Sequence, residues 1–141
     1  IRAKFESDIA EERVLRTVKR SIEDYWSGSF ELDGRIVNIR AEVSVRRLNP
    51  GEPFSVDALR LIEGPYTSAL RDGMQLSRKF EYTTPAHEFG HIIGLQDEYS
   101  EAYDGPSRSS VYRVNDSSLM SSHSGILHPR HFRQAYELLK P

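Results

Sequence analysis

One stretch near the middle of the chain, residues 84–97, constrains the fold and the chemistry more than any other. It carries two histidines four positions apart, His87 and His91. On a helix this spacing puts both imidazoles on one face, within reach of one tetrahedral metal ion. Glu88 follows the first histidine, where its carboxylate is placed to take a proton from a metal-activated water. The sequence therefore predicts a zinc site built on a helix.

The same stretch carries the boundary signals that such a helix needs. Thr84 is a favourable N-cap, and Pro85 falls at the first helical position, where its missing N–H costs nothing. An apolar side opposite the histidines would pack against the core. That side consists of Phe89, Ile92 and Ile93. Gly94 can take the left-handed conformation of a C-cap, so it predicts a sharp turn that brings Asp97 towards the metal.

The pattern His-Glu-x-x-His-x-x-Gly-x-x-Asp, from His87 to Asp97, resembles the metzincin clan of zinc metallopeptidases. It matches the variant in which Asp replaces the usual third His, as in snapalysin-like enzymes. Metzincins also carry a methionine turn after the zinc motif, and the stretch Ser118-Leu119-Met120-Ser121 is similar to it. The resemblance implies a compact α+β domain with a twisted mixed sheet backed by a helix, an active-site helix, a Met-turn at Met120 and a C-terminal helix.

The resemblance and the spacing together imply a zinc-dependent endopeptidase that acts on a protein or peptide substrate. Zn²⁺ would be held by His87, His91 and Asp97. Glu88 would serve as the general base for the water that attacks the peptide carbonyl. An Asp in place of a neutral third His would leave the metal a somewhat weaker Lewis acid.

Several alternatives stay open at the level of the sequence. The third ligand could instead be Glu98, which follows Asp97, or Glu137 on the last helix. The metal could be structural in a non-catalytic binding domain, although the presence of Glu88 argues against a closed structural site. The chain could also be a protease toxin or effector domain of a larger protein.

The sequence departs from the family pattern beyond the turn methionine. Some metzincins place a Tyr two residues after it, as an extra ligand or oxyanion donor, whereas this chain has Ser122. His123, Tyr99 and Tyr103 are the residues that could take this role. Residues 97–118 read as a polar surface loop rather than a calcium site, because no regular ligand spacing is present. The acidic residues of that loop include Glu101, Asp104 and Asp116.

Length and composition agree with this interpretation and exclude some alternatives. The chain has 141 residues, which predicts a single domain spanning 1–141. It has no cysteine, so a disulfide framework, a thiolate metal site and a deformylase-like Cys ligand are excluded. The net charge of −2 with interspersed signs predicts no nucleic-acid partner. No apolar run approaches the length of a membrane span.

The chain begins at Ile1 and carries no signal peptide. We therefore expect a processed form or an excised domain, secreted or delivered outside the producing cell. Nothing in the pattern predicts an oligomer, and we expect a monomer.

Periodicity predicts the elements before the zinc motif. A helix over 7–26, ended by Gly28, would back the sheet, and clean alternation predicts one strand over 37–45. A short strand at 29–32 would form a hairpin through the turn at Asp33-Gly34.

The remaining segments are less regular. Residues 55–62 are ambiguous between strand and short helix, while 66–70 and 74–82 predict two strands around a turn at 71–73. Pro129 opens a last helix, and we interpret His128 and His131 at its start as surface residues.

Overall fold

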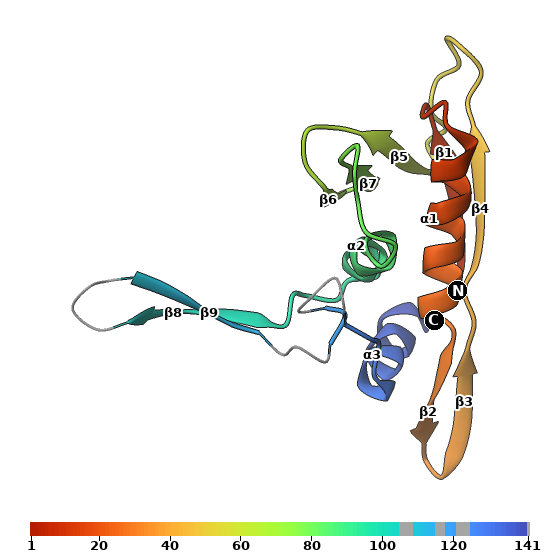
Figure 1. The fold of residues 1–141 in the computed structure, drawn as a ribbon. Coiled ribbons are helices and arrows are strands. Elements are labelled where there is room, and N and C mark those ends of the chain that lie inside the picture. Colours follow the sequence, from red (N-terminus) through yellow and green to blue (C-terminus); the bar gives the residue numbers. More distant parts are fainter. Residues whose placement is uncertain (105–108, 115–117, 121–124, 141) are drawn as a thin grey trace.

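The computed structural model describes residues 1–104, 109–114, 118–120 and 125–140, and it describes side chains for 1–98, 118–120 and 125–140. Within these residues the chain forms an α+β fold with three helices and a mixed sheet (Figure 1). The helices are α1 (Glu12–Tyr25), α2 (Thr84–Ile93) and α3 (Pro129–Leu139). The strands of the main sheet are β1 (Arg2–Ser7), β4 (Glu42–Arg47), β5 (Leu59–Glu63), β6 (Ser68–Leu70) and β7 (Gly73–Leu76). Two hairpins pair β2 (Gly28–Leu32) with β3 (Arg35–Ile39), and β8 (Tyr99–Asp104) with β9 (Ser109–Val114).

The main sheet has the strand order β4-β1-β5-β7-β6. The first four of these strands run parallel to their neighbours, and β6 runs antiparallel to β7 at one edge. In the register, Phe5 of β1 lies between Val45 of β4 and Leu59 of β5. This arrangement confirms the α+β class and the mixed sheet that the sequence predicts.

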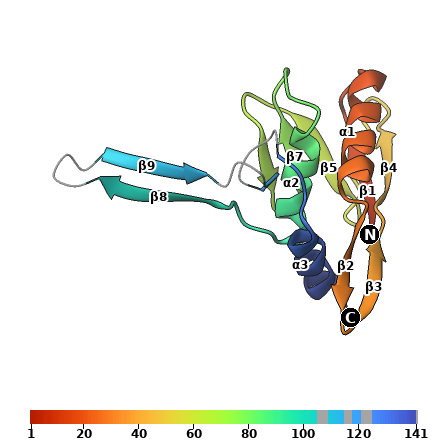
Figure 2. The same ribbon diagram turned by 60° about the horizontal axis from the view of Figure 1, so that its bottom comes forward.

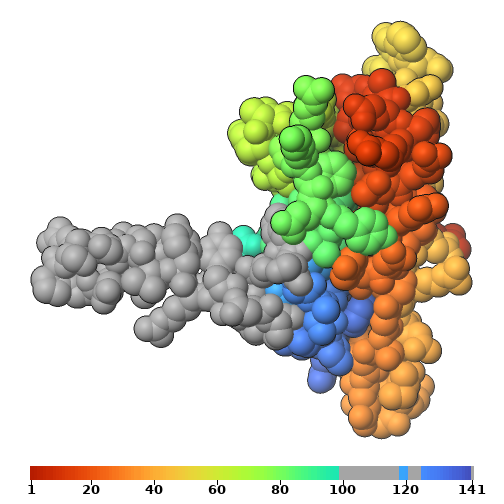
Figure 3. Space-filling view, viewed as in Figure 1, coloured from red at the N-terminus to blue at the C-terminus, as the bar shows by residue number. Residues whose placement is uncertain are grey.

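The core lies between the sheet, α1 and α2 (Figures 1 and 2). Phe5 from the sheet, Ile22 from α1 and Phe89 from α2 are all buried in it. The space-filling view shows α2 between α1 and α3 (Figure 3). Trp26, fully buried at the end of α1, donates its indole N–H to the carbonyl of Ala86 at 2.9 Å. This bond fixes α1 to the first turn of α2.

The pairings of β2 with β3 and of β6 with β7 are as the sequence predicts, although the lengths of the strands differ. β2 and β3 pair through Asp33 and Gly34, which have φ of 50° and 76°, the positive values that a tight hairpin turn requires. β6 and β7 also pair around the predicted turn, but β7 ends at Leu76 and not at Tyr82. The ambiguous segment before them forms the strand β5.

The first strand is absent from the sequence interpretation, which begins a helix at Ser7. β1 occupies residues 2–7 and α1 begins at Glu12. Both Glu6 and Ser7 are buried, so the strand does not show the regular alternation of one apolar and one solvated face. On its polar side Arg2 and Lys4 are exposed, whereas Glu6 is covered by residues 40 and 49 positions away, so the local sequence does not show that this end of the strand is buried.

Two further expectations are wrong. The predicted strand 37–45 is divided between β3 and β4, which belong to different sheets. Polar and apolar residues continue to alternate through Arg40 and Ala41, so the sequence pattern gives no sign that the strand is interrupted there. The predicted loop 97–118 contains β8 and β9, which pair from Tyr99↔Val114 to Asp104↔Ser109. Among the described residues no helix has the length and apolar character needed to cross a membrane.

Glu6 of β1 is the centre of a polar network on the sheet face opposite Phe5. Its carboxylate accepts hydrogen bonds from the backbone N–H of Ser55 at 2.7 Å and from its hydroxyl at 3.0 Å. Arg46 binds the same carboxylate at 2.8 Å and reaches Glu52 at 2.6 Å. The Ser55 N–H and the Arg46 guanidinium lower the pKa of Glu6 to about 2. The network therefore fastens the segment between β4 and β5 to the sheet.

We expect Glu6→Gln to destabilise the fold at neutral pH and to do so less in acid. The folded pKa of Glu6 lies below its ordinary value of 4.5, so the unfolded state binds the proton more readily. Its stabilising contribution is complete above about pH 4.5 and is lost as the pH falls towards 2. Urea unfolding of the parent and the variant at pH 7, 5 and 3 measures the difference, which should narrow at the lowest pH. Glu42→Gln, at an exposed ion pair with Arg2, is the control and should change stability little at any of these pH values.

Candidate metal centre

The helix α2 and the turn after it position the candidate ligands. Its N-cap is Thr83, one residue before the predicted Thr84. Pro85 lies in its first turn, where a backbone N–H would have no partner within the helix, so proline loses no hydrogen bond. The helix ends at Gly94, whose φ of 123° is unfavourable for residues with a side chain. The N–H of Leu95 bonds back to the carbonyl of Gly90 at 2.9 Å, so the chain turns sharply towards the helix axis.

This turn brings His87, His91 and Asp97 together. The Nε2 atoms of the two histidines lie 3.2 Å apart. Oδ1 of Asp97 lies 3.3 Å from Nε2 of His87 and 3.1 Å from Nε2 of His91. In the described part of the chain, these residues form the cluster of possible ligands that could hold a metal ion.

The backbone fixes the proton on each imidazole. Nδ1 of His87 lies 2.7 Å from the carbonyl oxygen of Leu119, and Nδ1 of His91 lies 2.9 Å from that of Leu95. Because a carbonyl oxygen can only accept, each Nδ1 carries the hydrogen and each neutral ring presents a lone pair at Nε2. In the neutral rings, two nitrogen lone pairs and a carboxylate oxygen are directed at one point. A cation among the three atoms suits that arrangement.

Glu88 lies beside this cluster and is 6% exposed. Burial raises the pKa of Glu88, while the nearby imidazoles of His87 and His91 and the backbone N–H of Ala69 act in the opposite direction. Ala69 belongs to the edge strand β6, so this strand passes next to the carboxylate. A carboxylate whose pKa is raised binds a proton more readily than a free one, as a general base must.

Met120 packs under the helix that carries the histidines. It is fully buried, and a Cβ built at Gly90 would lie 2.6 Å from its sulfur. Gly90 is thus required for this close approach of Met120 to α2. The residue before it, Leu119, supplies the carbonyl that orients His87. The segment 118–120 therefore packs against α2 and orients one of the candidate ligands, His87.

The alternative carboxylates have other partners. Glu98 is bound by the hydroxyl of Ser118, by Arg130 at 3.1 Å and by His131 at 2.7 Å. Burial raises the pKa of Glu98, but these three hydrogen bonds outweigh it and bring the value to about 2. Glu137 forms an ion pair with Lys140 at 2.6 Å. The structure thus brings Asp97 to the histidines, and it does not bring Glu98 or Glu137 there.

The expectation that His131 lies at the surface is wrong. Its ring is fully buried in the first turn of α3, and burial lowers its pKa against the opposing effect of Glu98. The sequence interpretation also missed the roles of Ser118 and of the carbonyl of Leu119. A carbonyl has no sequence signature, and the spacing of Glu98, Ser118 and His131 follows no local period.

Several residues singled out in the sequence lie outside what the structure describes. The backbones of Tyr99 and Tyr103 are part of β8, but their side chains are not described. Ser122 and His123 lie in the undescribed segment 121–124. The side chains of Glu101, Asp104 and Asp116 are likewise outside the described part.

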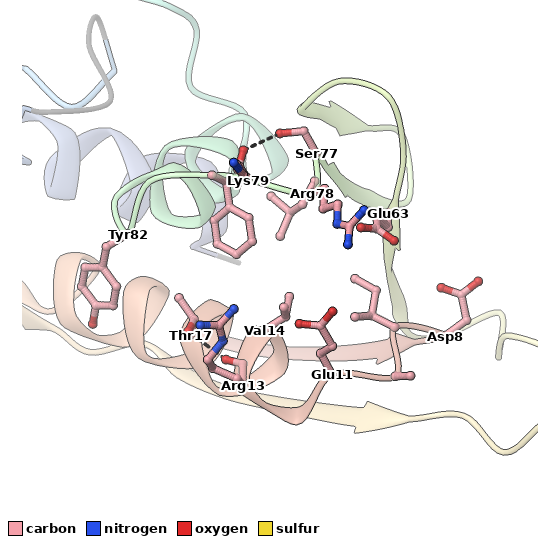
Figure 4. Close-up of a pocket in the computed structure, with 14 residues that line it drawn as sticks. Asp8, Glu11, Arg13, Val14, Thr17, Glu63, Ser77, Arg78, Lys79 and Tyr82 are labelled. Carbon is pink, nitrogen blue, oxygen red and sulfur yellow. Dashed lines mark hydrogen bonds between the residues drawn. The ribbon is translucent and has the colours of Figure 1, made fainter.

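Two of the hollows on the described surface lie beside the helices α1 and α3. One, of about 630 Å³, lies between the turn after α2 and α3 and includes Asp97 and Arg130. The other, of about 790 Å³, lies between the first turns of α1 and the segment after β7 (Figure 4). Arg13 and Thr17 line it from α1, with Ser77 and Lys79 opposite. Its charged lining residues are half acidic and half basic, and none belongs to the metal cluster. The metal cluster therefore remains the candidate functional site.

Comparison of the chain with protein-family models, with curated proteins and with solved structures found no match. The interpretation of the site therefore rests on its own geometry.

We expect Asp97→Ala to weaken metal binding by more than about 100-fold, because only two protein ligands remain where a stable site needs three. Asp97→His, which restores a donor at the same place, should recover part of the affinity. Zinc titration against a competing chelator measures both changes. Gln96→Ala, at the exposed neighbouring position, is the matched control and should bind zinc like the parent. Parental affinity in Asp97→Ala would remove Asp97 from the ligand set.

Proposed function

We propose that this chain is a zinc-dependent endopeptidase of the metzincin type, with His87, His91 and Asp97 as ligands and Glu88 as general base. The observation that carries the proposal is the convergence of three electron-pair donors next to a buried carboxylate. The order of the ligands, the glycine turn and the buried Met120 also fit the resemblance seen in the sequence.

The donor geometry fits a zinc ion. Zinc bonds of about 2.0–2.1 Å to nitrogen and oxygen place neighbouring ligands of a tetrahedron about 3.3 Å apart. The three separations in the cluster are 3.1, 3.2 and 3.3 Å. Imidazole nitrogen and carboxylate oxygen are both common zinc ligands, and three protein ligands are typical of catalytic sites that keep a fourth position open.

A zinc ion held there would polarise a peptide carbonyl and lower the pKa of water from near 16 to about 7. The chain itself supplies the proton transfer. Glu88 accepts the proton of the attacking water and returns it to the leaving amine, and burial raises its pKa, which favours the first of these transfers. The carbonyls of Leu119 and Leu95 orient the two imidazoles so that their Nε2 atoms would face a metal held there.

The edge strand β6 supports a peptide as the substrate. It pairs with β7 on one side, and no other described strand pairs with it. The backbone N–H of Ala69 on this strand reaches Glu88, so a chain added along β6 would pass the general base. Strand addition to an exposed edge is a common way of holding an extended peptide.

We expect Glu88→Gln to keep zinc and lose hydrolysis. Gln preserves the shape of the side chain but cannot accept the proton, so the cleavage rate should fall by roughly two to four orders of magnitude. Zinc content is measured by elemental analysis, and cleavage by mass spectrometry of new N-termini in a peptide library derived from a proteome.

Glu81→Gln, an exposed Glu just before α2, is the matched control and should cleave like the parent. Cleavage by Glu88→Gln at the parental rate would contradict the assignment of the base. A parent that binds one zinc and cleaves nothing would instead favour a metal-stabilised binding domain.

A further inference from the structure

Glu98, the residue after the candidate ligand Asp97, has a side chain held by hydrogen bonds from three other residues. Its Oε1 accepts hydrogen bonds from the hydroxyl of Ser118, from His131 at 2.7 Å and from Arg130 at 3.1 Å. The backbone N–H of Glu98 also donates to the carbonyl of Met120 at 3.0 Å. Side chain and backbone of Glu98 are therefore both attached to the segment 118–120, and the side chain is attached to α3 as well.

The ring of His131 is oriented by the start of α3. The backbone N–H of His128 donates to Nδ1 of His131 at 2.8 Å. Because an N–H can only donate, Nδ1 carries the lone pair and Nε2 of the neutral ring carries the hydrogen. That hydrogen is directed at Glu98, while Ser118 Oγ lies 3.1 Å from the same nitrogen. The fully buried ring is thus locked in one tautomer and one orientation.

Two elements of the metal centre depend on this cluster. Asp97 and Glu98 are consecutive and their carboxylates have different partners, so holding Glu98 against α3 restricts Asp97 to positions near the histidines. Ser118 accepts the N–H of Met120 at 3.1 Å, which shapes the turn that carries the carbonyl of Leu119. That carbonyl orients His87.

We propose that His131 is a positioning residue of the metal centre, which acts through Glu98 and Ser118 to fix the Asp97 carboxylate and the Leu119 carbonyl. The inference rests on the proposed function only for the choice of zinc as the metal. Partners of this kind, one bond away from the ligands, usually change metal affinity by about 10 to 100-fold when they are lost.

Two substitutions of His131 separate positioning from a purely structural role. His131→Gln can keep an N–H donor near the place of Nε2, facing Glu98, and loses the acceptor for His128. His131→Asn can keep an acceptor near Nδ1 and loses the donor to Glu98. Both remove the buried ring, so a structural role predicts similar effects on zinc binding. A positioning role predicts that the variant which keeps an N–H donor to Glu98, His131→Gln, binds zinc more tightly than His131→Asn.

The experiment measures the zinc Kd by chelator competition and the visible absorption of the Co²⁺ form, which reports ligand geometry. We expect His131→Asn to raise the zinc Kd about 10 to 100-fold and to alter the Co²⁺ spectrum. His131→Gln should stay within about threefold of the parent and keep its spectrum. Arg133→Gln, at an exposed position of α3, is the control and should match the parent.

Equal zinc Kd values for the Asn and Gln variants, or a parental value for Asn, would overturn the inference. If His131→Asn does not fold, Ser118→Ala takes its place, with a loss of at least about fivefold expected and a parental Kd contradicting the proposal. Cleavage is not part of this readout. A positioning effect on Kd in a chain that hydrolyses nothing would therefore sustain this inference and reject the endopeptidase function.

Discussion

The convergence of three electron-pair donors at one point is the constraint that the rest of the structure has to satisfy. Nε2 of His87, Nε2 of His91 and Oδ1 of Asp97 lie 3.1–3.3 Å from one another, and with neutral rings their lone pairs repel unless a cation lies among them. The fold must therefore hold the donors in place by other bonds before any metal binds. The carbonyls of Leu119 and Leu95 do this for the imidazoles, and each comes from a different segment of the chain.

Those segments are held in turn by contacts far apart in the sequence. Ala86, in the first turn of α2, donates its N–H to the hydroxyl of Ser21 at 3.2 Å and accepts the indole N–H of Trp26 at 2.9 Å. The first bond gives a partner to one of the N–H groups that a helix start leaves unpaired. Together they fix α2 against α1, and Met120 fills the space left by Gly90 on the same helix. The position of the histidines is thus a property of the whole core.

The sequence predicts those parts of the structure that have local causes. The helix of the zinc motif, the stop at Gly94 and the hairpin turn at Asp33 and Gly34 all follow from residues within a few positions of one another. The proximity of Asp97 to the histidines could be predicted for the same reason, since one glycine turn connects them.

The parts that could not be predicted depend on distant partners. Glu6 marks the first strand as half polar, but Arg46 and Ser55 compensate for its burial from 40 and 49 positions away. His131 looks like a surface residue because its partner Glu98 is 33 positions distant. The alternation through Arg40 and Ala41 is continuous, so only the pairing of β4 with β1 shows that the chain changes sheets there.

The charge of the cluster explains why an aspartate is compatible with the third position. A divalent cation held by His87, His91 and Asp97, with Glu88 ionised, leaves a site of no net charge, whereas a third histidine would leave one positive charge. Glu88 is nearly inaccessible to water, and transferring an unbalanced charge into such a place is costly. A cation held there would also oppose the effect of burial on Glu88, because a nearby positive charge lowers the pKa of a carboxylate. Asp97 would reduce that positive charge and so leave Glu88 a stronger base than it would be beside three neutral ligands.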